Sequence, residues 1–325
     1  MVCCVIGLGS MGKRRIGLLQ SLGEYEIIGV DSNKDRIDEA IAKYGIKAYP
    51  SLDEANKYHN VDCAFICTSP ISHSKIILQC LQHGFNVFSE ITLIADDYEE
   101  MISLAKEKGL VLFLSSTFLY RPETCHIIDE VKKGNKPFNY IYHIGQYLPD
   151  WHPWEKYNNF FVGNKRTNGC REILAIELPW LVTCFGDIKN IQVIRSKHSS
   201  LEVDYNDNYH ILLEHVNGNT GSLNVDVISR KAVRNMEVFN EDAYLRWGGT
   251  PDSLFAYNIQ NAKEEKVNIA ESGHKEGYAS FVTENPYLEE IKSFFEVVKN
   301  NNIKPKWDFE KDLKLLKHID KIEGI

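Results

Sequence analysis

The sequence has no apolar run near the roughly 20 residues that a membrane-spanning helix needs, and it shows no internal repeat or low-complexity linker. It therefore predicts a protein without a transmembrane segment. A predicted strand begins at Val2, so we also expect no signal peptide. The formal net charge is -8. Because basic residues are not in excess, nucleic acid or an anionic membrane is not expected as the main partner.

The eight cysteines show no C-x-x-C spacing, and the histidines show no metal-ligand spacing with cysteines or acids. Several cysteines lie inside predicted strands or helices. We therefore expect reduced, buried thiols in a cytoplasmic protein, and no metal site. The chain has 325 residues, of which 43% are hydrophobic, so it is long enough for two domains.

What the chain does have is a glycine-rich turn near its start. An apolar run over residues 2–6 is followed by GLGSMG at residues 7–12 and then by a predicted helix. This is G-x-G-x-x-G in the strand, turn and helix context of a dinucleotide-binding site. Gly7 allows the tight turn, Gly9 lets a pyrophosphate approach the backbone, and Gly12 lets helix and strand pack closely. The N–H groups of the helix would face the phosphates.

A second apolar run, residues 26–30, ends in Asp31, nineteen residues after Gly12. An acid at this place takes the adenosine ribose hydroxyls. The sequence therefore predicts NAD in preference to NADP, whose 2′-phosphate would face a carboxylate. Lys34 and Arg36 are close enough to weaken that preference, although both are equally explained as a solvated helix face.

Strand-like and helix-like segments alternate through the first 120 residues. This alternation predicts an α/β fold in which residues 1–120 form a Rossmann domain, with a doubly wound parallel sheet. Ligands bind at the carboxyl ends of such strands. The expected cofactor contacts are Gly7, Gly9, Ser10, Met11, Gly12, Asp31, Ser32, Arg36, Thr68, Ser69, Pro70, His73 and Glu90.

The pattern changes after residue 120. Long segments of strand-like alternation follow, interrupted by one convincing helix at about 171–185. They predict an α+β domain over residues 121–325, with a large, mostly antiparallel open sheet packed on helices on one face. Two amphipathic helices, opened by Pro286 and Asp308, are expected to pack back on the body of the protein.

With these motifs the chain resembles the Gfo/Idh/MocA family of dinucleotide-dependent oxidoreductases, most of which act on sugars and polyols. The matching stretches are residues 7–15, Cys67-Thr68-Ser69-Pro70 with His73, Ser89-Glu90, Tyr120-Arg121-Pro122 and residues 169–186. The run GQYLPDW at residues 145–151 is similar to a subgroup associated with cell-surface carbohydrate and acylated amino-sugar pathways. The resemblance also implies a homodimer or homotetramer, in which the open sheet packs against another subunit.

The family places a catalytic lysine in a Glu-Lys-Pro turn after the fifth strand, where this chain has Glu90-Ile91-Thr92. It also places a histidine between two acids on the helix after its glycine-rich loop. Our alignment puts Glu172, Ile176 and Pro179 at these three positions, and a shift of one residue puts Glu177 at the histidine position. An isoleucine cannot move a proton, and a positioned acid–base group is worth roughly 10²–10⁴ in rate.

The candidates for the missing acid–base group are His152, Lys165, Glu172 and Glu177. His152 titrates near neutrality, although a lone histidine is more often structural. Lys165 is either a displaced lysine or part of an exposed loop. Glu177 lies among apolar neighbours, so its carboxylate must be paired or face a cavity. We expect Glu172 or Glu177 to line the cleft.

The segment 146–155 is a loop, broken by two prolines, in which aromatic and polar side chains are mixed. Aromatic faces cover the C–H faces of a sugar and polar groups bind its hydroxyls, so the loop is a candidate sugar site; the alternative is an interface or core loop. Arg166 or Arg171 would clamp a carboxylate or phosphate. The expected substrate contacts are Tyr120, Arg121, Gln146, Tyr147, Asp150, Trp151, Trp154, Arg166 and Arg171.

Three functions are compatible with these observations. The first is an NAD-binding oxidoreductase that acts on a sugar, sugar acid or amino-sugar derivative through a displaced base. The second is a catalytically silent protein that binds cofactor and sugar. The third is NAD-assisted elimination or glycosidic cleavage through a transient keto sugar, as some members of the family that the chain resembles suggest.

Overall fold

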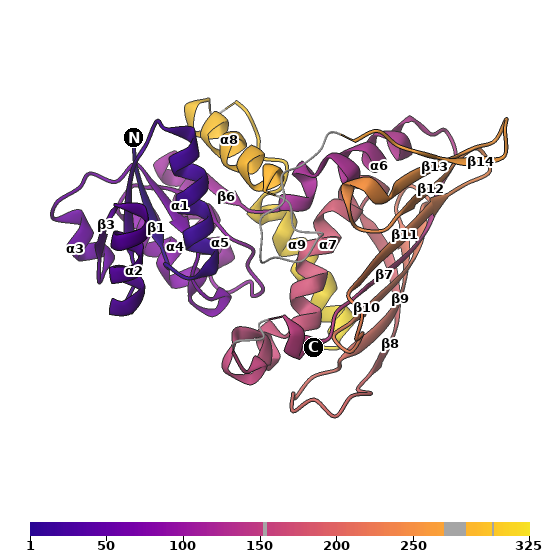
Figure 1. The fold of residues 1–325 in the computed structure, drawn as a ribbon, viewed down its shortest axis with the longest axis horizontal. Helices are drawn as coiled ribbons and strands as arrows, with labels where there is room; N and C mark the ends of the chain where they lie inside the picture. Colours follow the sequence, from indigo (N-terminus) through magenta and orange to yellow (C-terminus); the bar gives the residue numbers. More distant parts are fainter. Residues whose placement is uncertain (152–154, 270–283, 301) are drawn as a thin grey trace. The chain divides into compact units, whose positions relative to one another are not determined.

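The chain folds as two compact units (Figure 1). The computed structural model describes residues 1–151, 155–269, 284–300 and 302–325. The first unit comprises Met1–Ser116 with Tyr287–Lys314, and the second comprises Thr117–Pro286 with Leu315–Ile325. Residues 287–314 thus join the first unit, whereas the sequence placed them with the second domain. Among the described residues, no helix combines the length and the apolar character that a bilayer crossing requires.

Six parallel strands form the sheet of the first unit. They are β1 Val2–Ile6, β2 Glu26–Val30, β3 Lys47–Tyr49, β4 Cys63–Ile66, β5 Asn86–Ser89 and β6 Leu112–Leu114. Their order in space is β3-β2-β1-β4-β5-β6, and every neighbouring pair runs parallel. The strand order reverses between β1 and β4, which is the point at which doubly wound sheets bind ligands. The predicted Rossmann sheet is confirmed.

The helices of the first unit begin and end at residues that explain their limits. They are α1 Ser10–Leu22, α2 Lys34–Tyr44, α3 Leu52–Asn56, α4 His73–Gln82 and α5 Tyr98–Lys108. Gly23, Gly45 and Gly109 end three of them with φ between +65° and +72°, a conformation that side chains disfavour. Asn33 caps α2, because its side chain accepts hydrogen bonds from two backbone N–H groups of the first turn.

Helix α8 (Asn285–Lys299) packs on the sheet of the first unit through an aromatic cluster. Phe294 is fully buried and meets three rings edge to face, at centroid distances of 5.4, 5.6 and 5.7 Å; the rings belong to Phe65, Phe88 and Phe113. Edge-to-face pairs add about 0.5–1.5 kcal/mol each beyond the area that they bury. The cluster explains why this late segment belongs to the first unit, although it follows the second sheet in the chain.

A buried carboxylate gives the late segment a second anchor. Asp312, in α9 (Phe309–Glu323), accepts hydrogen bonds from the Tyr98 hydroxyl at 2.8 Å and from Trp307 Nε1 at 3.0 Å. The Tyr98 hydroxyl also bonds to Thr92, in the loop that follows β5. Asp312 is 3% exposed, and burial raises its pKa to about 6 even though these donors favour the charged form.

Eight strands form the sheet of the second unit. They are β7 Asn139–Gly145, β8 Ile188–Ser196, β9 Asn208–His215, β10 Thr220–Asp226, β11 Val233–Phe239, β12 Tyr244–Trp247, β13 Leu254–Asn258 and β14 Lys263–Lys266. Their order is β14-β13-β12-β11-β7-β10-β9-β8. Only the central pair β7–β10 runs parallel within this described sheet. The predicted large, mostly antiparallel sheet is confirmed, while the β13–β14 hairpin was not foreseen because its outer strand is entirely charged.

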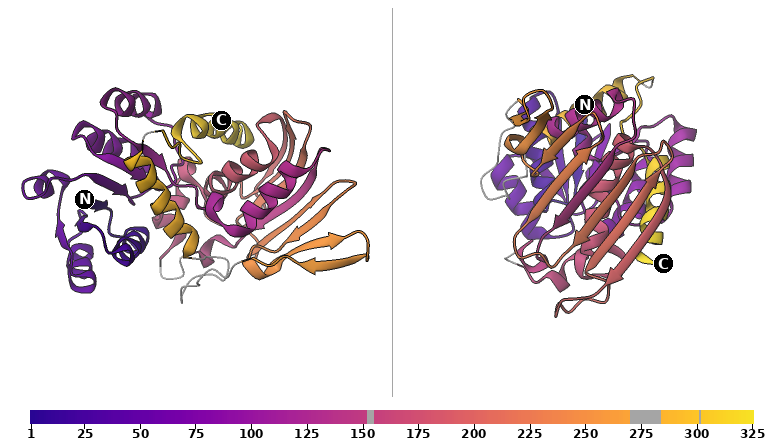
Figure 2. Two further views of the ribbon diagram at one scale, coloured as in Figure 1. Left: turned by 90° about the horizontal axis from the view of Figure 1, so that it is seen from above. Right: turned by 90° about the vertical axis from the view of Figure 1, so that its right-hand side faces the viewer.

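Helices α6 (Pro122–Lys133) and α7 (Gly169–Phe185) lie on one face of this sheet (Figure 2). Strand β7 shows why the two faces differ. Tyr140, Tyr142 and Ile144 are buried, whereas Ile141 between them is 50% exposed on the opposite face. Within the part of the second unit that the structure describes, that opposite face carries no helix.

Asp312 predicts a pH dependence of stability. Its folded pKa, about 6, lies above its ordinary value of 3.8, so its contribution to stability is present below about pH 4 and is lost as the pH rises through 6. A shift of this size corresponds to about 3 kcal/mol. We expect Asp312→Asn to remove this loss. The difference in free energy of unfolding between the variant and the parent chain should therefore shift by about 2–3 kcal/mol in favour of the variant when the pH is raised from about 4 to 7.5.

Denaturant unfolding at the two pH values measures this difference. Glu310→Gln is the matched control, because Glu310 is an exposed carboxylate on the same helix. The same pH dependence in Asp312→Asn as in the parent chain would contradict the assignment.

Candidate functional site

The three glycines of the motif at residues 7–12 have different structural roles, and the last of them lies in the first turn of α1. A Cβ on Gly12 would lie 1.9 Å from the carbonyl oxygen of Gly7, and a Cβ on Gly7 would lie 2.8 Å from the backbone of Cys67. Gly9 is different, because among the described residues the one atom within 4 Å of its Cβ position is Arg36 Nη1, at 3.9 Å. Gly7 and Gly12 are therefore required for backbone packing, and Gly9 keeps space clear in front of the helix.

Helix α1 begins at Ser10, directly after Gly9 and next to this space. Gly9 is its N-cap, and no side chain of the described residues caps it. The first N–H groups of a helix lack partners within the helix and carry the positive end of its dipole. Ser10 and Met11, two of the expected cofactor contacts, lie in this first turn, so the helix start suits a pyrophosphate.

Asp31 follows β2 beside the glycine turn, as the sequence predicted. Its Oδ2 accepts the N–H of Leu8 at 2.8 Å, and its Oδ1 accepts the N–H of Asn33 at 2.8 Å. The residue is 7% exposed, and Arg36 Nη1 lies 3.7 Å from Oδ2. Ser32 is exposed next to it. The acid expected to take the ribose hydroxyls is therefore fixed by the backbone.

Thr68, Ser69 and Pro70 follow β4 and lead into α4 at His73. His73 Nε2 lies 2.9 Å from the carbonyl oxygen of Thr68, and it carries the proton because a carbonyl only accepts. Burial lowers the pKa of His73 to about 4, so the ring is neutral. Its buried Nδ1 has no hydrogen-bond partner among the described residues, so it presents a free acceptor at this end of the strand.

A buried ion network, which the sequence did not indicate, holds Glu90 at the end of β5. Arg15 of α1 donates to Glu90 at 2.6 Å and to Glu290 of α8 at 2.9 Å, and its guanidinium stacks over Phe88. Glu290 also accepts the N–H of Ser116 at 2.6 Å. Burial acts to lower the pKa of Arg15, but the two carboxylates raise it, so the guanidinium stays charged.

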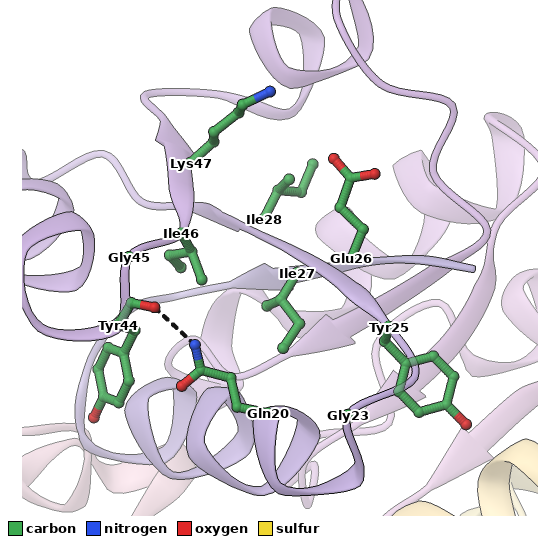
Figure 3. A pocket seen from close by; sticks show the side chains of 10 residues that line it. All are labelled: Gln20, Gly23, Tyr25, Glu26, Ile27, Ile28, Tyr44, Gly45, Ile46 and Lys47. Atoms are coloured by element: carbon green, nitrogen blue, oxygen red, sulfur yellow. Dashed lines mark hydrogen bonds between the residues drawn. The ribbon is translucent and has the colours of Figure 1, made fainter.

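A groove of about 490 Å³ opens elsewhere on the first unit (Figure 3). It is lined by Gln20, Gly23, Tyr25, Glu26, Ile27, Ile28, Tyr44, Gly45, Ile46 and Lys47. Gln20 donates to the carbonyl oxygen of Tyr44 at 2.7 Å. The groove includes the first residues of β2, whereas ligands of such sheets bind at the carboxyl ends. It is therefore distinct from the glycine turn.

In the second unit, Glu177 of α7 is fully buried and fully paired. Its carboxylate accepts hydrogen bonds from the Tyr142 hydroxyl and Trp180 Nε1, both at 2.8 Å. Arg234 of β11 donates to it twice, at 2.7 and 3.1 Å. The sequence required Glu177 to be paired or to face a cavity, and the structure pairs it. This arrangement favours a role in holding α7 on the sheet.

Glu172, one turn earlier on α7, has a different environment. Its Oε2 is buried and accepts no hydrogen bond from a described residue. Burial raises the pKa of Glu172 to about 8, and the residue as a whole is only partly covered. A carboxyl group with this pKa is mostly protonated at neutral pH, and it gains or loses its proton at pH values close to neutrality.

Two of the expected substrate arginines have carboxylate partners inside the second unit. Arg171 pairs with Glu323 and, at 2.7 Å, with Asp320. Arg121 pairs with Glu123 at 2.6 Å and donates to the carbonyl oxygen of Gly249 at 2.9 Å. Both arginines are at most 5% exposed. These ion pairs stabilise the fold of the second unit. This structural role is the alternative to binding an anionic group of the substrate.

The remaining expected residues lie in turns. Lys165 and Arg166 are exposed in a short 3-10 helix, Lys165–Thr167. In the candidate sugar loop, Trp151 Nε1 donates to the carbonyl oxygen of Gln146 at 3.1 Å, and Arg230 stacks 3.7 Å over the Tyr147 ring. Asp150 is exposed and Tyr120 is partly exposed. His152 and Trp154 lie outside the described residues.

Residues 1–116 match the family described as GFO_IDH_MocA, an oxidoreductase family with an NAD-binding Rossmann fold. The match covers the part of the chain that forms the six-stranded sheet of the first unit. The resemblance seen in the sequence is thereby confirmed. Over 113 residues the chain is 31% identical to the myo-inositol 2-dehydrogenase of Thermotoga maritima, an alignment that covers 34% of each protein. The chain thus spans about a third of the length of this curated relative.

Solved structures extend the similarity of fold to the whole chain. The UDP-N-acetylglucosamine 3-dehydrogenase GnnA of Acidithiobacillus ferrooxidans superimposes with a TM-score of 0.78 at 18% identity, over 100% of this chain and 97% of that one. The WlbA dehydrogenase of Bordetella pertussis, solved with NADH and UDP-GlcNAcA, gives 0.78 at 16% identity over 100% and 97%. At these identities the likeness establishes the fold alone.

The glycine turn makes a prediction for cofactor binding. We expect Gly9→Ala to fold normally, because its Cβ enters open space, but to weaken NAD binding roughly tenfold or more, or about 1.4 kcal/mol, because the methyl group occupies the pyrophosphate's place. Calorimetry with NAD measures the affinity. Gly12→Ala is the contrasting variant, and its clash with Gly7 should cost about 1–3 kcal/mol of stability. Unchanged NAD affinity in folded Gly9→Ala would refute the assignment.

Proposed function

We propose that the protein is an NAD-dependent oxidoreductase that acts on a sugar, sugar acid or amino-sugar derivative. The observation that carries the proposal is the open glycine turn, with an uncapped helix start on one side and Asp31 on the other. These groups fit the pyrophosphate and the adenosine ribose of a dinucleotide. The family match of residues 1–116 supports the same cofactor.

The substrate class rests on the relatives and on one loop. The relatives named above act on a polyol, by the name of the first, and on a UDP-linked amino sugar, by the name of the second. In this chain the segment 146–151 combines the rings of Tyr147 and Trp151 with the polar groups of Gln146 and Asp150. Rings beside hydrogen-bonding groups are what a sugar requires of its binding site.

NAD, when bound, would accept or supply a hydride. The chain's own residues must then bind and orient the substrate and move one proton at its oxygen. The positions that carry lysine and histidine in the resembling family hold Ile91 and Ile176 here, and neither side chain moves a proton. We propose Glu172 for this task. Its Oε2 lacks a partner among the described residues, and its pKa of about 8 allows it to give a proton in reduction or accept one in oxidation.

The other candidates fit this task less well. Glu177 has four hydrogen bonds and a buried cation beside it, so its carboxylate is committed to the fold. Lys165 lies exposed in a short 3-10 helix, where no described structure encloses it as a site would. We retain His152 as an alternative on its residue type alone.

Because Ile91 and Ile176 cannot move a proton, two alternative functions also remain in consideration. A catalytically silent protein would bind NAD and a sugar without turnover. An NAD-assisted elimination or glycosidic cleavage would need the cofactor without consuming it. Incubation with NAD and a panel of polyols, sugar acids and nucleotide-linked amino sugars separates the three. Accumulation of NADH supports the oxidoreductase, product without net NADH supports the cleavage, and cofactor and sugar binding without either supports the silent protein.

We also propose that the chain assembles as a homodimer or homotetramer through the open face of the eight-stranded sheet. Ile141, Ile194 and Leu212 lie on that face and are 50%, 70% and 55% exposed. A second subunit would remove these side chains from water, which stabilises the assembly.

Glu172 makes a kinetic prediction. We expect Glu172→Gln to lower kcat by about 10²–10⁴ with little change in the affinity for NAD, because the amide keeps the shape but cannot exchange a proton. In the parent chain, oxidation should rise and reduction should fall as the pH passes about 8, and the variant should lose this inflection. Steady-state kinetics over pH measure both effects.

Glu177→Gln is the matched control on the same helix. It leaves Arg234 as an uncompensated buried charge, so it should lower the free energy of unfolding by about 3 kcal/mol or more while the folded fraction keeps its pH profile. A normal kcat in Glu172→Gln would remove Glu172 from the mechanism.

A further inference from the structure

Arg230 lies over the ring of Tyr147, a residue of the candidate sugar loop. The central carbon of its guanidinium is 3.7 Å from the ring centroid, which is a close cation–π contact. No described residue offers this guanidinium a carboxylate or carbonyl oxygen within hydrogen-bonding distance. Arg230 is also exposed. Its N–H groups are therefore available to a ligand, while the ring fixes the position of the side chain.

The other stacked arginines of the described part of the second unit differ from Arg230, because a carboxylate binds each of them. Arg121 pairs with Glu123, Arg234 with Glu177 and Arg246 with Glu264, and each also lies over an aromatic ring. Arg230 has the aromatic contact without a carboxylate from the described residues. An anionic group of a ligand would complete the same arrangement.

The fold itself places Arg230 beside the candidate sugar loop. Strands β7 and β10 run parallel, so their carboxyl ends meet at one edge of the sheet, and the two loops leave from that edge. The N–H of Leu148 donates to the carbonyl oxygen of Val227 at 3.0 Å, which joins the loops. Asp226 accepts the N–H of Ser229 at 2.7 Å and so directs the chain just before Arg230. The contact between the two loops is therefore built into the backbone.

The start of α7 packs against the same two loops. A Cβ on Gly169 would lie 3.0 Å from Val227 Cγ1 and 3.4 Å from Trp151 Cη2. Glu172, our candidate for proton transfer, belongs to the first turn of this helix. The rings of the candidate sugar loop, the free positive charge and the proposed proton carrier therefore belong to adjoining segments of the second unit.

We infer that Arg230 is a specificity-determining residue that binds an anionic group of the substrate, so that the protein prefers sugars with a carboxylate or a phosphate to neutral sugars. This inference rests on the proposed sugar oxidoreductase and narrows its substrate class. A guanidinium fork matches two oxygens of either anion, and such pairs are stronger than neutral hydrogen bonds. The competing explanation is a surface arginine that only covers the Tyr147 ring, and such a residue would not distinguish charged from neutral sugars.

Calorimetry of the full chain with NAD present tests the inference with two matched pairs of ligands. Glucuronate and glucuronamide differ in a carboxylate, and UDP-N-acetylglucosamine and N-acetylglucosamine differ in the nucleoside diphosphate. We expect the charged member of at least one pair to bind at least about tenfold more tightly than the neutral member. Arg230→Ala should remove most of this preference, and Arg230→Lys should retain part of it. The pair that responds distinguishes a carboxylate from a diphosphate.

Arg246→Ala is the control, because Arg246 also lies over a ring but its guanidinium is bound by Glu264. It should change none of these affinities. Equal binding of charged and neutral ligands, no binding of either charged ligand, or a preference that survives in Arg230→Ala would overturn the inference. Reduction of NAD by neutral sugars would still support the proposed function in these cases, whereas a parent chain that binds no NAD would overturn that function.

Discussion

The first unit depends on the contact between two backbones, at Gly7 and Gly12. No side chain fits at position 12, where a Cβ would lie 1.9 Å from the Gly7 carbonyl oxygen. This closeness lets α1 begin immediately after the turn, with its uncapped first turn beside Gly9. The same placement brings Arg15 to Glu90 at the end of β5. One steric constraint therefore sets both the phosphate-binding helix start and the ion network behind it.

Both units bury carboxylates, and most of them are paired with a guanidinium. Arg15 serves Glu90 and Glu290 in the first unit, and Arg234 serves Glu177 in the second. Removing one partner of such a pair costs about 3–5 kcal/mol, because the remaining charge stays in a medium that solvates it poorly. The groups in such pairs are poor proton donors or acceptors in catalysis, because the counterion stabilises the charged state of each group. A group that exchanges a proton at neutral pH needs the opposite environment.

The structural features that could be predicted from the sequence are those that local residue patterns encode. The glycine turn, Asp31 and the strand periodicities identified the Rossmann sheet and the antiparallel sheet, and the structure confirms both. Partners distant in the chain left no such pattern. Arg15 and Glu290 are 275 residues apart, and Glu177 and Arg234 are 57 apart. For the same reason Arg171 was assigned to substrate, because nothing near it in the chain shows that Asp320 and Glu323 occupy its guanidinium.

The proposed function depends on which side chain can move a proton, because our alignment places isoleucines where the family that the chain resembles has lysine and histidine. Ile91 and Ile176 have no ionisable group, so in the proposed oxidoreductase another residue would have to move the proton at the substrate oxygen. Glu172 differs from Glu177 on the same helix. Its Oε2 has no hydrogen-bond partner among the described residues, whereas both oxygens of Glu177 accept hydrogen bonds. Burial raises the pKa of Glu172 to about 8. A carboxyl in that state gives and takes a proton with nearly equal ease, which is the property that reversible oxidation of an alcohol requires.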